Sequence, residues 1–175
     1  DGVAPFLQQA VQLDCVIHVY TMGSYSYTEK VLDCLDPKAV IFGVEPGKIM
    51  CREEGGAVFK KSIAHILPED TDAKVWGRVM IVDDREDAWD RQSRDHLLKL
   101  PAFYYFGPKP GVALGALPVR PEESGAPRDS ALEDVMGVLR AVRQGLSSGS
   151  DANVPTALRK LRRGTLQGCT LVFSG

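Results

Sequence analysis

The first hundred residues of the chain alternate between short apolar runs and clusters of charged residues. The most distinct run is Val79-Met80-Ile81-Val82, which leads directly into the acidic stretch at residues 83–87. An unbroken apolar run that is too short for a helix predicts a strand buried on both faces, as in a parallel sheet between helices. A β-branched run at residues 15–20 ends at Thr21 and a glycine-containing turn, which predicts a second strand. Polar side chains are therefore expected at the carboxyl ends of parallel strands, where ligands bind in open α/β sheets.

Apolar residues at helical spacing predict the helices that flank this sheet. The predicted helices cover residues 3–13, 25–35, 60–67, 132–142 and 155–163. Short strands are expected within residues 40–59, and a strand and its covering element at residues 96–100 and 103–106. The Pro-, Gly- and Ala-rich residues 107–128 predict a loop. The resulting order of strands and helices predicts an α/β fold.

Composition and charge limit the classes of protein that fit this pattern. The 175 residues are 44% hydrophobic, which is enough for the core of one domain or of one domain with part of another. A net charge of -2 gives no overall basic field that would favour nucleic acid or membrane as a partner. The four cysteines lack CxxC spacing, so they predict reduced thiols in cytosol or nucleus and no zinc site.

Asp83 and Asp84 are adjacent carboxylates whose charges repel, so a site that uses both needs a cation. Mg²⁺ is the expected cation because it prefers oxygen ligands. Successive side chains of a strand point to opposite faces, so the two aspartates are expected to serve different partners, one of them in the crevice. The alternative is a solvated turn in which an aspartate caps a helix.

Lys60 and Lys61 open the helix predicted at residues 60–67. Cations at the amino end of a helix oppose its dipole by roughly 0.3 to 1 kcal/mol each, so an anionic ligand would explain them better than stability does. The alternative is that two exposed lysines decorate a surface turn, where charges contribute little.

The polar signals occur in an order that resembles a known superfamily. Thr21, Lys61 and the pair Asp83-Asp84 resemble motifs II, III and IV of the haloacid-dehalogenase superfamily of phosphotransferases. Four segments are similar to the TFIIF-associating type of RNA polymerase II carboxy-terminal-domain phosphatase, namely residues 19–23 (VYTMG), 35–37 (LDP), 42–43 (FG) and 82–89 (VDDREDAW). Residues 153–163 are similar to the segment that precedes the BRCT domain of this family, and residues 165–175 to the opening strand of that domain.

The resemblance implies a haloacid-dehalogenase-like, Rossmann-type parallel sheet flanked by helices and truncated at its amino end. It also implies a Mg²⁺-dependent protein phosphatase in which one aspartate attacks phosphoserine or phosphothreonine and a second acts as general acid and base. By position, Thr21 would hydrogen-bond a phosphoryl oxygen and Lys61 would stabilise the phosphoaspartate. Asp83 would ligate Mg²⁺ with the support of Asp84.

The nucleophile motif of the family, DxDx(T/V), would lie upstream of Asp1, so the chain is expected to be an inactive part of a longer enzyme. The expected divisions are a partial catalytic domain at residues 1–106, a linker with helical segments at residues 107–164, and the first BRCT strand at residues 165–175. The implied substrate is the phosphorylated C-terminal domain of RNA polymerase II, with TFIIF as a further partner and the nucleus as the location. Neither direct nucleic-acid binding nor a membrane partner is expected.

Two other classes of protein use similar residues. A non-catalytic phosphopeptide-binding scaffold would keep the fold and lose the upstream aspartates. A receiver-type phosphoacceptor domain also places acids, Thr and Lys at strand ends. In receiver domains the acidic pair precedes Thr and Lys, whereas here it follows them, so the order argues against this class.

Overall fold

Two predicted helices near the start of the chain form where the apolar spacing placed them. The computed structural model describes residues 2–38, 41–42, 49–51, 60–102 and 130–164. Helix α1 spans Val3–Gln12 and buries Leu7 and Ala10, and helix α2 spans Tyr25–Leu35. Helix α2 ends before Asp36, which precedes a proline and therefore disfavours helical backbone.

Four short strands form two two-stranded parallel sheets within the described residues. Strand β1 (Val19–Tyr20) pairs with β2 (Ile49–Met50), and β3 (Ile81–Asp83) pairs with β4 (Leu97–Lys99). Every strand pair within the described residues is parallel. This pairing, together with the flanking helices, confirms the predicted α/β architecture.

Strand β3 differs from its prediction in two ways. It begins at Ile81 and includes Asp83, so this acid is the last residue of the strand. The prediction that the run is buried on both faces is wrong, because Ile81 is 6% exposed whereas Val82 is 39% exposed. Met80 lies on the same face as Val82 and packs against helices α4 and α5, whereas the side chain of Val82 is exposed to solvent.

The helix predicted at residues 60–67 is also wrong. Only a single 3-10 turn, η1 (Ile63–His65), forms there. Lys61 instead makes a parallel bridge with Trp89, in which the Lys61 amide donates to Ala88 O at 2.8 Å and the Asp90 amide donates to Lys61 O at 2.9 Å. Lys61 is therefore held in an isolated β-bridge and does not open an α-helix.

Shorter elements connect the strands. They are α3 (Ala73–Trp76), η2 (Glu86–Ala88) and η3 (Ser93–His96). The Asp72 side chain caps α3 by accepting a hydrogen bond from the Lys74 amide at 2.7 Å. Strand β4 forms within the segment predicted at residues 96–100. The segment predicted at residues 103–106, the loop at residues 107–128 and the strand at residues 165–175 lie outside the described residues.

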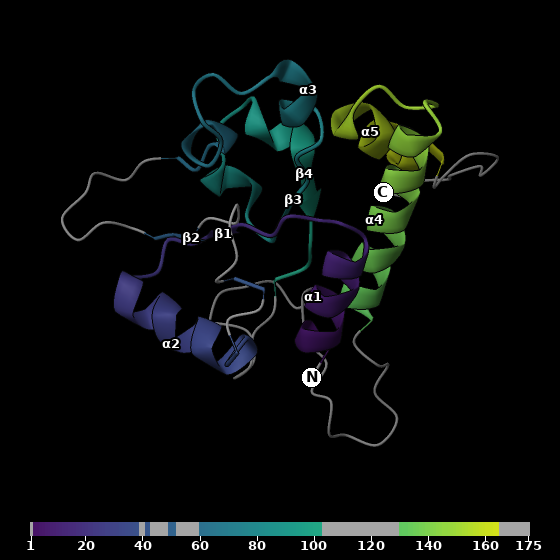
Figure 1. Ribbon diagram of the computed structural model, residues 1–175. Helices are drawn as coiled ribbons and strands as arrows, with labels where there is room; N and C mark the ends of the chain where they lie inside the picture. The colour runs from purple at the N-terminus through teal and green to yellow at the C-terminus, as the bar shows by residue number, and fades with distance from the viewer. Residues whose placement is uncertain (1, 39–40, 43–48, 52–59, 103–129, 165–175) are drawn as a thin grey trace, which may run out of the picture.

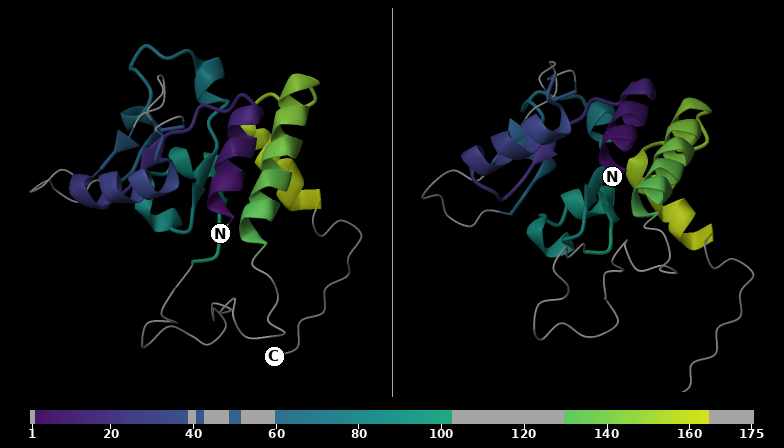
Figure 2. Two further views of the ribbon diagram at one scale, coloured as in Figure 1. Left: turned by 60° about the horizontal axis from the view of Figure 1, so that its bottom comes forward. Right: turned by 90° about the horizontal axis from the view of Figure 1, so that it is seen from below.

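Helices α4 (Ala131–Ser147) and α5 (Val154–Gly164) form as predicted and pack against the strands. Their cluster of buried residues comprises Val142, Val154, Ala157 and Leu158, with Met80, which directly precedes β3, packed against it. Figure 1 shows α1, α4 and α5 on one side of the strands and α2 on the other, and the views in Figure 2 agree. The predicted linker segment thus contains helices that cover one face of the sheet.

A second cluster of buried residues lies on the other face of the β3–β4 sheet. It comprises Ile63, Ile81, Trp89 and Leu97, and Tyr20 and Trp76 pack against it. Because Ile81 and Met80 are neighbours in sequence, strand alternation directs them into different clusters. The two clusters fix the strands from both sides and so hold the end of β3 in place.

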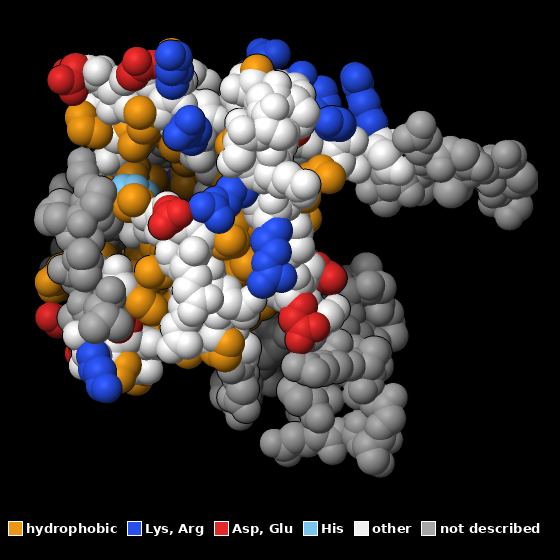
Figure 3. Space-filling view, turned by 45° about the vertical axis from the view of Figure 1, so that its right-hand side comes forward, with side chains coloured by type: hydrophobic (Ala, Val, Ile, Leu, Met, Phe, Trp, Pro, Cys, Tyr) orange, Lys and Arg blue, Asp and Glu red, His pale blue; other side chains and the backbone are white. Residues whose placement is uncertain are grey.

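Polar contacts attach the two C-terminal helices to the rest of the fold. The Val154 amide donates to Gly77 O at 2.7 Å, and the guanidinium of Arg162 donates to Leu97 O. Other basic side chains of α5, such as Arg159 and Arg163, are exposed, and Figure 3 shows Lys and Arg side chains gathered at this end of the molecule.

No helix within the described residues is both long and apolar enough to cross a membrane.

Two glycines of α4 provide a matched test of this packing. A Cβ at Gly137 would meet nothing within 4 Å, whereas a Cβ at Gly145 would lie 2.0 Å from Asp151 Oδ2. We expect Gly137→Ala to raise the free energy of unfolding by about 1 kcal/mol, because alanine favours helix. Gly145→Ala should lower it by roughly 1 to 3 kcal/mol through overpacking. Urea unfolding of both variants would measure these changes, and a shift of both in the same direction would contradict the packing described.

Candidate functional site

A largely buried ion pair lies at the carboxyl end of β3. Lys61 Nζ is 2.8 Å from Asp83 Oδ2, and the two side chains are only 9% and 13% exposed. The backbone bridge to Trp89 positions Lys61, and the pairing of β3 with β4 positions Asp83. Two residues that the sequence placed in separate motifs are therefore in direct contact.

Asp83 accepts two further hydrogen bonds. The Trp89 indole Nε1 donates to Oδ2 at 2.9 Å, and the Arg85 amide donates to Oδ1 at 2.9 Å. Burial alone would raise the pKa of Asp83, but the hydrogen bonds from Lys61, the Arg85 amide and Trp89 outweigh it and lower the pKa. Asp83 is therefore a carboxylate at neutral pH.

Two aromatic rings surround the ammonium group of Lys61. Its Nζ lies 5.2 Å from the ring centroid of Trp89 and 5.7 Å from that of Tyr20. The two rings pack edge to face with centroids 5.6 Å apart, and the Tyr20 hydroxyl is 2.7 Å from His65 Nδ1. Burial raises the pKa of Tyr20, so its hydroxyl stays protonated at neutral pH. The ammonium thus lies beside electron-rich ring faces that favour a cation.

The other two predicted site residues, Thr21 and Asp84, are not members of the ion pair. Thr21 follows β1, directly after Tyr20, and its Oγ1 accepts a hydrogen bond from the Gly23 amide at 3.0 Å. Asp84 directly follows Asp83 and is exposed. Thr21 is connected to the ion pair through the preceding residue, Tyr20, whose ring lies beside the ammonium of Lys61.

Asp87 and Asp90, two other acids close to Asp83 in the chain, bond to the local backbone or to surface groups. Asp87 pairs with Arg85 at the surface, where an ion pair contributes little. Asp90 Oδ1 accepts a hydrogen bond from the Ser93 amide at 2.7 Å. Within the described residues no group of three or more His, Cys, Asp or Glu side chains gathers as a metal site. Asp83 is thus the acid of this stretch that faces the buried lysine.

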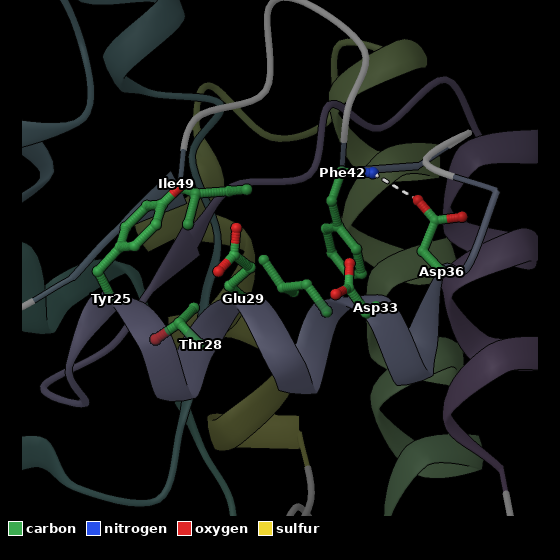
Figure 4. Close-up of a pocket in the computed structure, with 8 residues that line it drawn as sticks. Tyr25, Thr28, Glu29, Asp33, Asp36, Phe42 and Ile49 are labelled. Carbon is green, nitrogen blue, oxygen red and sulfur yellow. Dashed lines mark hydrogen bonds between the residues drawn. The ribbon is translucent and has the colours of Figure 1, made fainter.

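A separate pocket of about 150 Å³ lies between α2 and β2. Figure 4 shows its lining side chains, which are Tyr25, Thr28, Glu29, Leu32, Asp33, Asp36, Phe42 and Ile49. Asp36 closes one end by accepting hydrogen bonds from the amides of Ile41 and Phe42 at 2.7 and 3.0 Å. No predicted site residue lines this pocket, so it is distinct from the Lys61–Asp83 pair.

Parallel strands with helices on both sides place the chain among the haloacid-dehalogenase-like α/β proteins. A family model described as NLI interacting factor-like phosphatase matches residues 1–119. The chain therefore belongs to the NLI interacting factor-like phosphatase family. Both the predicted superfamily fold and the predicted phosphatase family are confirmed.

Relatives of known name agree with this assignment. The solved structure of Fcp1, an essential RNA polymerase II CTD phosphatase, matches with a TM-score of 0.64 at 25% identity, over 99% of this chain and 57% of that one. The Arabidopsis thaliana protein named RNA polymerase II C-terminal domain phosphatase-like 4 is 28% identical over 98% of this chain and 38% of its own length. A C-terminal domain phosphatase of RNA polymerase II from Schizosaccharomyces pombe is 31% identical over 60% of this chain and 13% of its own length. The chain spans well under half the length of these two curated relatives.

Sequence reasoning missed the roles of Trp89 and Tyr20 around Lys61. Trp89 lies within the motif at residues 82–89, but the motif alone gives it no part in the site. A lone tryptophan among acidic residues is the signal that could have indicated it, because a buried indole N–H needs an acceptor. Tyr20 directly precedes the predicted site residue Thr21, yet nothing in the sequence indicates its contact with Lys61.

The lowered pKa of Asp83 predicts a specific dependence of stability on pH. A carboxyl whose pKa in the folded state lies below its ordinary value of 3.8 stabilises the fold above that value, and this contribution is lost as pH falls through the lowered pKa. Asp83→Asn should therefore unfold more easily at pH 7, by about 3 kcal/mol, because Lys61 loses its partner. The difference from wild type should shrink below about pH 4. Urea unfolding between pH 7 and pH 2 measures both, and a difference that stays constant with pH would contradict this reasoning.

Proposed function

We propose that this chain forms part of a magnesium-dependent protein serine/threonine phosphatase that acts on the C-terminal domain of RNA polymerase II. The observation that supports the proposal is the buried Lys61–Asp83 pair at the carboxyl end of a parallel strand. Phosphoryl transfer needs mainly positioning and compensation of negative charge, and a fixed ammonium group provides that compensation. The names of the relatives supply the substrate.

In the proposed reaction a carboxylate upstream of Asp1 attacks the phosphorus of a phosphoserine or phosphothreonine. The bond from phosphorus to the side-chain oxygen breaks, and a second upstream aspartate donates the proton that this oxygen takes. Water then gives a proton to this second aspartate and attacks the phosphorus of the phosphoaspartate, which releases inorganic phosphate and restores both aspartates. The ammonium of Lys61 stabilises the negative charge in both steps, and the hydroxyl of Thr21 donates to a phosphoryl oxygen.

The described residues fit a magnesium ion beside Asp83. A carboxylate has roughly four acceptor positions. Oδ2 accepts from Lys61 and Trp89, but Oδ1 accepts only from the Arg85 amide within the described residues, which leaves it an open position. Asp84 adds a second carboxylate at the surface, and Mg²⁺ prefers oxygen ligands. Bound there, the ion would neutralise charge on the phosphate.

The remaining features of the proposal follow from the same family. The substrate places the protein in the nucleus, and TFIIF is proposed as a partner. The proposed divisions are a partial catalytic domain at residues 1–106, a helical linker at residues 107–164 and the first strand of a BRCT domain at residues 165–175. The last of these segments lies outside the described residues.

Adjacent lysines allow a matched test of this function. Lys61 is buried against Asp83, whereas Lys60 is exposed and donates to Asp87 O at 3.2 Å. In a chain extended upstream to include the two aspartates, Lys61→Met should lower kcat towards a phosphoserine heptad peptide roughly 100-fold or more. Lys60→Met should change it by less than about twofold. Steady-state phosphate release with Mg²⁺ measures both, with thermal unfolding recorded for each variant.

The 175-residue chain by itself is the second control, and it should release no phosphate because Asp83 is held by Lys61 and cannot serve as nucleophile. Turnover by this chain at a rate near that of the extended chain would mean that the nucleophile lies within it. An extended chain that binds the phosphopeptide without turnover would instead indicate the non-catalytic scaffold.

A further inference from the structure

Trp89 touches both members of the ion pair, although neither the family assignment nor the proposed reaction gives it a role. It is 3% exposed and follows the turn η2. The parallel bridge places its backbone beside that of Lys61, with the amide of Lys61 bonded to Ala88 O and the amide of Asp90 bonded to Lys61 O. The positions of Trp89 and Lys61 are therefore set by the same backbone hydrogen bonds.

The indole of Trp89 and the ammonium of Lys61 share one oxygen. Trp89 Nε1 donates to Asp83 Oδ2 at 2.9 Å, and Lys61 Nζ donates to the same atom at 2.8 Å. The ammonium also lies 5.2 Å from the centroid of the Trp89 ring, within the range of a cation–π interaction. One side chain thus contacts the anion through its N–H and the cation through its ring.

This arrangement makes the two oxygens of Asp83 different. Among the described residues, Oδ2 has two donors, which fill its acceptor positions, whereas Oδ1 has one donor, the Arg85 amide. Rotation of the carboxylate about its last bond would break both bonds to Oδ2. The carboxylate of Asp83 is therefore held in one orientation, in which Oδ1 is the oxygen that remains available to a further ligand.

The Trp89 ring is itself held in place. Tyr20 packs edge to face against it at 79°, and the Tyr20 hydroxyl is hydrogen-bonded to His65. Trp89 also belongs to the buried cluster that includes Ile63 and Leu97. Because the ring is packed on several sides, its N–H keeps one direction, and that direction is towards Asp83.

We propose that Trp89 is a positioning residue for phosphoryl transfer. By donating to Oδ2 and lying beside the ammonium, it fixes the orientation of Asp83 and directs the remaining N–H groups of Lys61 towards the phosphoryl group. A phenylalanine at this position would keep a ring beside Lys61 but would leave Oδ2 with one donor. The catalytic effect in this inference rests on the proposed function, whereas the hydrogen bond between Trp89 and Asp83 does not depend on it.

The kinetic test compares the two tryptophans of the chain. In the upstream-extended protein, Trp89→Phe should lower kcat roughly 10- to 100-fold with KM unchanged, as for other groups that orient a catalytic ligand. Trp76→Phe is the control, because Trp76 packs against the same cluster but does not donate to Asp83, and it should leave both constants unchanged. A Trp89→Phe enzyme with unchanged kcat, or with only a raised KM, would overturn the proposal.

A spectroscopic test on the 175-residue chain needs no activity. Its two tryptophans give two indole N–H signals in a ¹H–¹⁵N spectrum, and Trp76→Phe assigns them. The Trp89 signal should lie downfield and exchange slowly with solvent, and Asp83→Ala should move it upfield and speed its exchange. Asp84→Ala, at the adjacent exposed residue, should do neither. The proposal would also be overturned if the Trp89 indole N–H exchanged fast and Asp83→Ala changed neither its chemical shift nor its exchange rate.

The two tests separate this inference from the proposed function. If the extended wild-type protein releases no phosphate, the proposed function fails, and the indole measurement alone decides whether Trp89 holds Asp83. If the wild type is active and Trp89→Phe is equally active, the function stands and the positioning role of Trp89 fails.

Discussion

The ion pair between Lys61 and Asp83 imposes the constraint on which this site depends. Removing a lysine and an aspartate from water costs free energy, and a buried pair is favourable only when its geometry is good and its other hydrogen-bonding positions are filled. Here the second donor to Asp83 Oδ2 is Trp89, and Oδ1 is bound by the Arg85 amide. Breaking any of these contacts would leave a buried charge without full compensation, so the surrounding backbone must hold its geometry closely.

The fold meets this requirement by packing the strand ends from two sides. Helices α4 and α5 cover one face through the cluster around Val142 and Leu158, and the cluster around Ile63 and Trp89 fills the other. The two helices thus pack against the residues beside β3 and β4, although they lie far from them in sequence. The same strand that ends in Asp83 separates the two clusters.

The sequence was sufficient for features that depend on local spacing. The helices α1, α2, α4 and α5 follow from apolar periodicity. Motif order singled out Lys61 and Asp83, which the structure brings into contact. The helix at residues 60–67 was predicted wrongly because Ile63, Ile66 and Leu67 have helical spacing, whereas the bridge between Lys61 and Trp89 overrides it. The role of Trp89 was missed for the same reason, since it depends on contacts between segments that are distant in sequence. Tertiary pairing of this kind leaves no local pattern.

The central claim is that this chain supplies the charge compensation for a phosphoryl group carried by an aspartate upstream of Asp1. The most direct test is to find where that group goes. A single turnover of the upstream-extended chain with a phosphoserine heptad peptide would be quenched, reduced with borohydride to convert any acyl phosphate to a stable alcohol, and mapped by mass spectrometry. We predict one modified aspartate, upstream of Asp1, that is lost when Lys61 is replaced by Met. Modification of Asp83 or Asp84, or turnover without any modified aspartate, would contradict this claim.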